Sequence, residues 1–302
     1  MAKTARMAEQ EYSGRSTPLV VPDGSLDGVP EPLRRNGPQT DLRCVSLVAP
    51  ESYESGRYQQ LRSTIERKEP DGRAVVLAVT SPSAGDGKTL TAINLAGAFA
   101  HNSQFRVLIV DVDMRRASET MGRYFGLPAE GQAGLTDVLH RPESGLHPTL
   151  QVRGLPNFSV LLRGRRDAHA YEMLASERFG EFVERVRAYY HYVILDAPPI
   201  LPVPDNSAIS RWIDGFLLVV TANRTPREAL AEAMRSIGED KLKGIVLNRC
   251  EPLAKRYYSY YGRYGGRRRG YHANAFRAGD PQTLYESPAW PPQQGGVEIE
   301  RR

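Results

Sequence analysis

A short apolar run, a loop of small residues and a helical pattern follow one another in residues 74–102. Residues 74–80 (AVVLAVT) have the β-branched composition of a buried strand, and residues 89–102 carry apolar side chains at helical spacing. Between them, residues 82–89 (PSAGDGKT) match the last three positions of the phosphate-loop pattern G-x-x-x-x-G-K-[ST], although Pro82 stands at the first glycine position. We therefore predict a strand, a phosphate-binding loop and a helix.

The loop has the residue types that binding of a nucleoside triphosphate requires. Gly85 and Gly87 allow the backbone to approach closely, and the N–H groups at the start of a helix attract phosphate. Lys88 would reach the β- and γ-phosphates, and the hydroxyl of Thr89 would bind Mg²⁺. An ordinary turn with a surface lysine is the alternative, which the strand–loop–helix context disfavours. The predicted nucleotide-binding residues of the loop and first turn are Ala84, Gly85, Asp86, Gly87, Lys88, Thr89 and Leu90.

Further apolar runs alternate with helical patterns along the chain, and this alternation predicts the fold class. Such an arrangement favours an α/β fold with a mostly parallel sheet and helices on both of its faces. Ligands of these sheets bind at the carboxyl ends of the strands. The additional strands are expected at residues 107–112, 158–162, 192–195, 216–220 and 243–247.

Acidic residues follow two of these predicted strands. Asp111 and Asp113 end the run VLIVDVD, and Asp196 follows YVIL. Mg²⁺ at bound phosphates takes oxygen ligands, which carboxylates on neighbouring strand ends provide. We therefore expect Asp111 and Asp196 to bind the metal together with Thr89, whereas Asp113 also suits the cap of a helix.

Composition divides the chain into three parts. Residues 1–48 and 253–302 are rich in proline, glycine and charge, and such stretches bury too little apolar area to offset chain entropy. We predict a disordered N-terminal segment, a folded domain at residues 49–252 and a flexible tail. Within the tail, residues 255–276 (KRYYSYYGRYGGRRRGYHANAF) combine six tyrosines with six basic residues.

Cysteine content and hydropathy indicate the cellular compartment in which the protein is expected. The two cysteines, Cys44 and Cys250, imply neither a disulfide framework nor a metal cluster and fit a reducing cytosol. No secretory signal is visible, and the longest apolar runs, such as residues 216–222, fall short of the roughly 20 residues of a membrane span. We expect a cytoplasmic protein that reaches the inner membrane only through a partner or a charged surface.

Taken together, the motifs resemble those of the bacterial tyrosine kinases (BY-kinases), P-loop NTPases related to the ParA/MinD group. That family carries a Walker A loop, an A′ motif hhhDxDxR, a Walker B motif hhhDxPP and a terminal tyrosine cluster. The corresponding stretches are SPSAGDGKTLTAINLA (81–96), VLIVDVDMRRAS (107–118), YVILDAPPI (192–200) and the tail. All four occur in the family's order over residues 50–271.

The resemblance implies an ATP-dependent protein-tyrosine autokinase that uses Mg²⁺ and regulates the synthesis and export of extracellular polysaccharide. Lys88 and Asp196 would act on the phosphates and metal, Asp111 would accept the phenolic proton, and Asp113 would support it. Asn248 would lie near adenine. The phosphoacceptors would be Tyr257, Tyr258, Tyr260, Tyr261, Tyr264 and Tyr271.

The resemblance also implies partners. These are a membrane-anchored polysaccharide co-polymerase that activates the kinase, further copies of the chain for trans-phosphorylation, and a cognate tyrosine phosphatase; nucleic acid is not expected. One departure concerns the E-x-x-R-x-x-R helix that helps the family to assemble rings. In residues 51–67, Arg62 aligns with the last arginine, but Gly56 and Gln59 occupy the glutamate and first arginine positions.

Other functions stay open at this point. A ParA/MinD-like ATPase that positions DNA or protein assemblies shares the fold. That group carries a signature lysine where this chain has Ser83, and it lacks the terminal tyrosine cluster that this chain has. A tail rich in Arg, Gly and Tyr can also stack on nucleic-acid bases. A GTPase is a third option, but residues 248–251 (NRCE) depart from NKxD at Arg249 and Glu251. Salt bridges on a helix face explain at least one of the adjacent residues Arg115 and Arg116 more simply than phosphate contact does.

Overall fold

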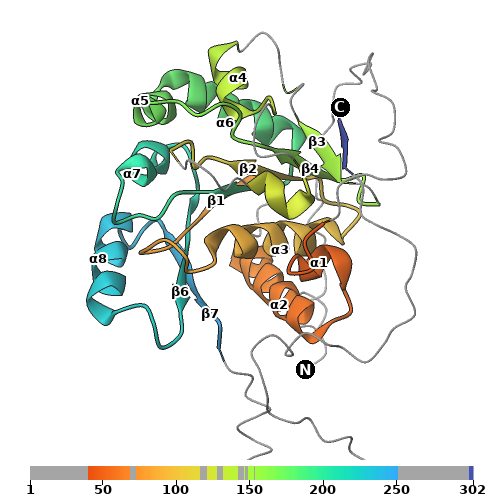
Figure 1. Cartoon of the computed structure of the whole chain (residues 1–302), viewed down its shortest axis with the longest axis horizontal. Helices are drawn as coiled ribbons and strands as arrows, with labels where there is room; N and C mark the ends of the chain where they lie inside the picture. Colours follow the sequence, from red (N-terminus) through yellow and green to blue (C-terminus); the bar gives the residue numbers. More distant parts are fainter. Residues whose placement is uncertain are drawn as a thin grey trace, which may run out of the picture. The chain divides into compact units, whose positions relative to one another are not determined.

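A mostly parallel sheet of eight strands forms the centre of the folded unit (Figure 1). The strands are β1 (Val75–Thr80), β2 (Val107–Asp111), β3 (Leu150–Val152), β4 (Phe158–Leu161), β5 (Tyr192–Asp196), β6 (Gly215–Thr221), β7 (Leu242–Asn248) and β8 (Ile299–Arg301). Their order is β7-β6-β1-β5-β2-β4-β3-β8. The first six strands in this spatial order, from β7 to β4, are parallel to one another. The strand β3 pairs antiparallel with β4 and with β8. The prediction of an α/β fold is confirmed.

The computed structural model describes most of the predicted domain. The chain divides into two units, residues 1–248 with 297–302 and residues 249–296. The sheet and the helices that cover it belong to the first unit. The described residues are 40–68, 73–115, 121–127, 132–141, 146, 149–152, 154–250 and, for the backbone alone, 299–301.

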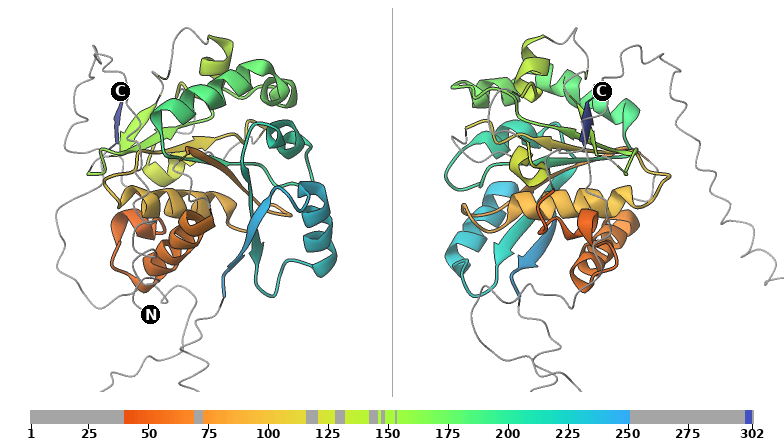
Figure 2. Two further views of the ribbon diagram at one scale, coloured as in Figure 1. Left: turned by 180° about the vertical axis from the view of Figure 1, so that it is seen from behind. Right: turned by 45° about the vertical axis from the view of Figure 1, so that its right-hand side comes forward.

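Helices cover both faces of the sheet, as predicted (Figure 2). One face carries α1 (Val45–Val48), α2 (Tyr53–Lys68), α3 (Lys88–Ala100) and the 3₁₀-helix η1 (Met121–Phe125). The other carries α4 (Leu135–His140), α5 (Ala170–Ala175), α6 (Glu177–Tyr189), α7 (Asp205–Ser210) and α8 (Arg227–Ile237).

The double covering explains why the central strands are apolar without alternation. In β1, Leu77 and Val79 pack into the core beneath α3, whereas Val76 and Ala78 pack into the core on the opposite face. Strands that are buried on both faces need apolar side chains at every position.

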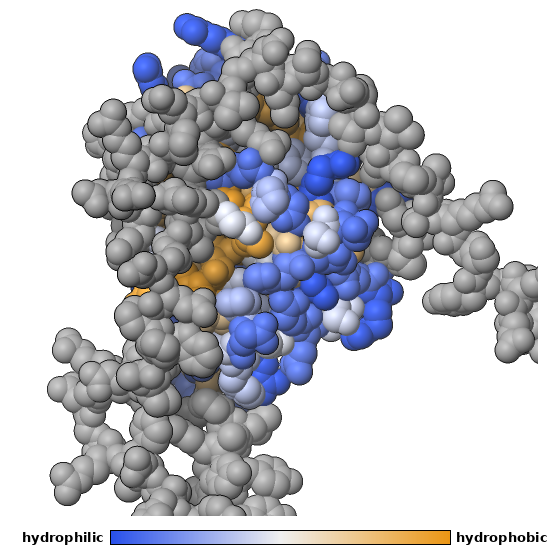
Figure 3. Space-filling model, turned by 90° about the vertical axis from the view of Figure 1, so that its right-hand side faces the viewer, coloured by the Kyte–Doolittle hydropathy of each residue, from blue (hydrophilic) through white to orange (hydrophobic). Residues whose placement is uncertain are grey.

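The face shown in Figure 3 is mainly hydrophilic over its described residues, with a narrow apolar strip.

Three elements differ from the sequence-based boundaries. The helix α1 and the buried side chains of Cys44 and Leu47 already belong to the core, although the folded domain was expected to begin at residue 49. The strand β3 is three residues long and too short for a periodic signal. The backbone of β8 pairs with β3 in a stretch that was expected to be tail.

The helix predicted at residues 51–67 is α2. Its Arg62 donates a hydrogen bond from Nη1 to the carbonyl oxygen of Ala98 in α3 at 3.1 Å, and its Nε lies 3.4 Å from Oε1 of Glu66. Arg62 thus holds α2 against α3 within one chain. Among the helices of the described residues, none combines the length and the apolar character needed to cross a bilayer.

Arg187, near the end of α6, joins the amino ends of β1 and β6. Its Nη1 donates to the carbonyl oxygen of Ala74 (2.6 Å) and to Asp214 Oδ2 (2.9 Å), and its Nη2 donates to Asp214 Oδ1 (3.1 Å). Asp214 Oδ2 also accepts from the backbone N–H of Val76 at 2.7 Å. A bidentate, largely buried pair of this kind is stronger than a surface salt bridge.

We predict that Arg187→Ala lowers the free energy of unfolding by about 2–3 kcal/mol, because Asp214 loses its paired guanidinium and the Ala74 carbonyl loses the donor from Arg187. Urea denaturation followed by circular dichroism measures this change. Glu181→Ala, at an exposed position of the same helix, is the control and changes the free energy by less than about 0.5 kcal/mol. Equal effects of the two substitutions would contradict the role of Arg187.

Candidate active site

The predicted phosphate loop connects the carboxyl end of β1 to the amino end of α3, which begins at Lys88. Gly85 and Gly87 have φ angles of +88° and +93°, in the left-handed region that side chains rarely adopt. A Cβ atom on Gly87 would lie 2.2 Å from Nδ2 of Asn248. The loop therefore has the conformation in which backbone N–H groups and the helix terminus gather around an anion.

Side chains at the ends of β6 and β7 hold this loop in place. The buried carboxylate of Asp86 accepts hydrogen bonds at Oδ1 from the hydroxyls of Thr221 (2.8 Å) and Thr225 (3.2 Å), and at Oδ2 from the N–H of Ser83 (3.3 Å). Asn248 Nδ2 donates to the carbonyl oxygen of Asp86 at 2.9 Å. Thr221 and Thr225 were not predicted from the sequence, where their only signal is their place at and just after the end of an apolar strand.

The outer parts of the loop differ in exposure. Ala84 and Gly85 are exposed, Thr89 is buried, and Leu90 packs against the core that contains α1. Asn248 lies against the loop, and its predicted contact with adenine stays a prediction.

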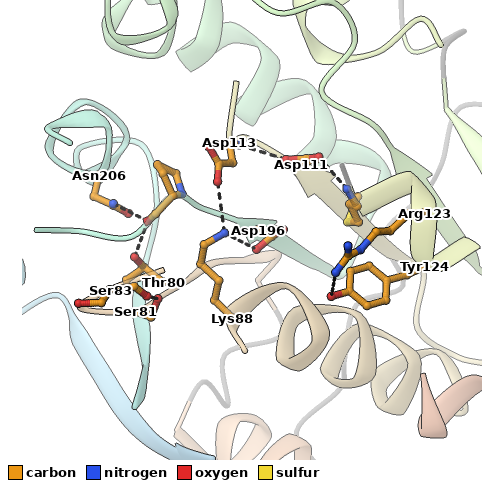
Figure 4. A network of polar contacts seen from close by, with 12 residues as sticks. Thr80, Ser81, Ser83, Lys88, Asp111, Asp113, Arg123, Tyr124, Asp196 and Asn206 are labelled. Atoms are coloured by element: carbon orange, nitrogen blue, oxygen red, sulfur yellow. Dashed lines mark hydrogen bonds and ion pairs between the residues drawn. The ribbon is translucent and has the colours of Figure 1, made fainter. Parts of the chain in front are cut away.

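Figure 4 shows the ammonium group of Lys88 between two carboxylates. Lys88 Nζ lies 3.3 Å from Asp113 Oδ2 and 3.6 Å from Asp196 Oδ1, and all three side chains are buried. The sheet order causes this convergence, because β5 lies between β1 and β2 and Asp111 is directly opposite Asp196 in the parallel register. The phosphate loop and the three predicted acids therefore lie at one edge of the sheet.

Asp111 is held by backbone groups. Its Oδ1 accepts from the N–H of Asp113 at 3.1 Å, and its Oδ2 accepts from the N–H of Met121 at 3.2 Å. Burial, followed by the negative charges of Asp196 and Asp113, raises the pKa of Asp111 to about 7. Asp111 is thus a fixed, buried carboxyl group that is easily protonated.

The oxygen donors suit a magnesium ion that phosphate helps to hold. Within the described part of the chain, no three His, Cys, Asp or Glu side chains are arranged to hold a metal by themselves. Mg²⁺ usually takes one or two carboxylates together with phosphate oxygens and water, so such a cage is unnecessary. The buried carboxylate of Asp196 and the buried hydroxyl of Thr89 provide hard oxygen ligands beside the loop.

Comparison with known proteins agrees with this geometry. A family model described as an AAA domain matches residues 74–239. The tyrosine-protein kinase YwqD of Bacillus subtilis is 32% identical over 233 residues, which cover 76% of this chain and 96% of YwqD. The chain belongs to the bacterial tyrosine-kinase family. The resemblance inferred from the motifs is confirmed, and this protein is a P-loop protein-tyrosine kinase that binds ATP.

Solved structures support the assignment. The chimerical protein CapA2B2 superposes with a TM-score of 0.63 and 27% identity, covering 74% of this kinase and 96% of the chimera. The kinase domain of the Escherichia coli tyrosine kinase ETK superposes with a TM-score of 0.60 and 25% identity, covering 68% and 78% of the two chains.

Arg115 forms an ion pair with a residue outside the phosphate loop. Arg115 Nε donates to both carboxylate oxygens of the buried Asp205, at 3.0 and 2.9 Å, so Arg115 forms an ion pair with the start of α7. Arg116 lies outside the described residues. So do the predicted phosphoacceptors Tyr257, Tyr258, Tyr260, Tyr261, Tyr264 and Tyr271.

We predict that Gly87→Ala weakens ATP binding by about 10- to 100-fold, the equivalent of 1–3 kcal/mol of backbone strain. The added methyl would have to displace Asn248, and φ would remain unfavourable. Isothermal titration calorimetry with Mg·ATP measures the affinity. Gly56→Ala in α2 is the control, since nothing lies within 4 Å of its Cβ, and it leaves the affinity unchanged. Unaltered binding by Gly87→Ala would contradict the assigned loop.

A second prediction concerns stability. The folded-state pKa of Asp111 is raised from 3.8 to about 7, so the folded kinase loses stability as pH rises through that interval. Asp111→Asn removes the buried charge, although its amide nitrogen replaces one of the two oxygens that accept backbone N–H groups. Loss of the charge is the larger effect at about pH 8, and we predict that it raises the melting temperature of the nucleotide-free kinase by roughly 2–6 °C.

The gain shrinks at about pH 5, where the wild-type carboxyl is already protonated. Asp113→Asn, which removes a partner of Lys88, gives no such gain. Scanning calorimetry at both pH values tests the prediction, and a pH-independent gain for Asp111→Asn would refute the electrostatic explanation.

Proposed function

We propose that this kinase transfers the γ-phosphoryl group of Mg·ATP to tyrosines of its own C-terminal cluster, residues 257–271, in another copy of the chain. The observation that carries the proposal is the convergence of Lys88 with Asp111, Asp113 and Asp196 beside a left-handed glycine loop. Phosphoryl transfer depends mainly on positioning and charge neutralisation, and this arrangement offers both.

The loop and Lys88 would hold the phosphates. N–H groups of the loop and of the first turn of α3 face the anion, and Lys88 brings a positive charge that is held at the strand ends by Asp113 and Asp196. When bound, Mg²⁺ neutralises charge on the β- and γ-phosphates. Thr89, Asp196 and Asp111 are its proposed ligands, directly or through water.

Asp111 is the proposed base. A tyrosine hydroxyl has a pKa near 10 and is a weak nucleophile until its proton is accepted. In the proposed step, the phenolic proton passes to the Asp111 carboxylate while the phenolic oxygen bonds to the γ-phosphorus. The bond from that phosphorus to the β–γ bridging oxygen breaks, and ADP leaves. Asp113 supports the base because its backbone N–H holds Asp111 Oδ1 in place.

The tail gives the reaction a regulatory consequence. Residues 255–276 are basic, and each phosphate adds nearly two negative charges, so phosphorylation reverses the charge of the segment. By analogy with the family, we propose that this switch controls self-association and docking to a membrane-anchored polysaccharide co-polymerase. The kinase would then regulate polysaccharide synthesis and export from the cytoplasmic side of the inner membrane, with a tyrosine phosphatase reversing the modification.

The test is phosphorylation of the purified chain with Mg·ATP, with and without the activating segment of a co-polymerase. Mass spectrometry is expected to find phosphotyrosine within residues 257–271, and Lys88→Ala abolishes it. Replacing the six cluster tyrosines with Phe removes the label but keeps ATP binding. Tyr53→Phe and Tyr189→Phe, at exposed positions of the folded unit, leave the label unchanged.

Intact ATP hydrolysis without phosphotyrosine under every condition would reject the proposal. ATP-dependent dimerisation or DNA binding without labelling would instead favour a ParA/MinD-like switch. Steeply salt-dependent binding of nucleic acid by the tail would instead favour a nucleic-acid-binding function of the tail.

A further inference from the structure

The turn between β6 and α8, residues 221–225, is attached to the phosphate loop. Asp86 Oδ1 accepts from the hydroxyls at both ends of the turn, Thr221 (2.8 Å) and Thr225 (3.2 Å). The turn is also closed on itself, because the N–H groups of Arg224 and Thr225 donate to the carbonyl oxygen of Thr221 at 3.2 and 3.1 Å. The position of this β6–α8 turn therefore depends on a residue of the loop itself.

The turn contains Arg224, whose guanidinium lies beside Gly85 of the phosphate loop. A Cβ atom placed on Gly85 would lie 3.9 Å from Nη2 of Arg224, and it would meet no other heavy atom within 4 Å. Arg224 is exposed, so its guanidinium is open to solvent beside the exposed Gly85. Asn223, just before it, has a φ of +58°. Asparagine adopts this left-handed conformation more readily than other non-glycine residues, and it suits a tight turn.

The charges at the site favour a further cation in addition to Lys88 and the proposed Mg²⁺. Lys88 already faces the carboxylates of Asp113 and Asp196, and Asp111 is a third acid at the same edge of the sheet. A nucleoside triphosphate adds several negative charges to this acidic surrounding. A guanidinium donates paired hydrogen bonds to phosphate oxygens and suits this task better than a single ammonium group.

We propose that Arg224 is a further phosphate-binding residue of this kinase, and that Asp86, through Thr221 and Thr225, is the positioning residue that delivers it. This inference rests on the ATP-dependent reaction proposed above. Its readout is nucleotide binding, so it can fail or hold independently of tyrosine phosphorylation.

The test measures the affinity of the full chain for the non-hydrolysable analogue Mg·AMP-PNP by isothermal titration calorimetry. Arg224→Gln is expected to weaken binding about 5- to 20-fold at about 50 mM KCl. At about 500 mM KCl the loss shrinks by half or more, because the contact is exposed to solvent and salt screens it. Arg224→Lys keeps part of the affinity, and Arg235→Gln, exposed in the last turn of α8, keeps all of it.

The delivery by the turn has its own test. Thr225→Val removes the hydroxyl that donates to Asp86 and accepts from the N–H of Thr221, and it is expected to weaken binding as Arg224→Gln does, whereas Thr225→Ser restores it. The double variant Arg224→Gln with Thr225→Val is no weaker than either single variant, because both remove one interaction.

Two outcomes would overturn the inference. If Arg224→Gln binds AMP-PNP within twofold of wild type, Arg224 does not contact phosphate. If Thr225→Val weakens binding while Arg224→Gln does not, the turn only supports the loop. Loss of affinity in Arg224→Gln together with an unlabelled tail would reject the tyrosine-transfer proposal and leave this one standing.

Discussion

The buried ammonium group of Lys88 is the feature on which the rest of the site depends. It lies between Asp113 and Asp196 at the carboxyl edge of the sheet, where water is largely excluded. Two buried carboxylates without a cation would be costly, since isolated charges lose several kcal/mol of hydration. The same lysine has to serve the phosphates when nucleotide binds, and the acids then need another positive charge. The site is therefore arranged around an exchange of ionic partners.

The sheet order makes that arrangement possible. Because β5 lies between β1 and β2, the loop after β1 and the acids that end β2 and β5 reach one point. The neighbouring strands β6 and β7 contribute the other support, since Thr221 and Asn248 end them and bond to Asp86 of the loop. The functional groups thus lie at the carboxyl ends of the strands. At the amino ends, contacts such as the ion pair between Arg187 and Asp214 join neighbouring parts of the fold.

The active-site acids work against stability. Asp111 is buried beside two like charges, and its raised pKa shows that the folded state resists its ionisation. Apolar side chains cover both faces of the sheet, and their burial provides stability that offsets this electrostatic cost. Such conflict between local energetics and the global fold is typical of functional positions.

The sequence by itself determined the α/β class, the phosphate loop and the acids at the strand ends. These depend on local patterns: a β-branched run, a glycine loop before a helix, and aspartates after apolar strands. Only the tertiary structure revealed that Asp86 bonds to Thr221 and Thr225, which lie 135 and 139 positions away, or that Asn248 lies against Gly87. It likewise placed α1 in the core and added β3 and β8 to the sheet. Contacts of such separation depend on the order in which strands are laid side by side, and no local periodicity records that order.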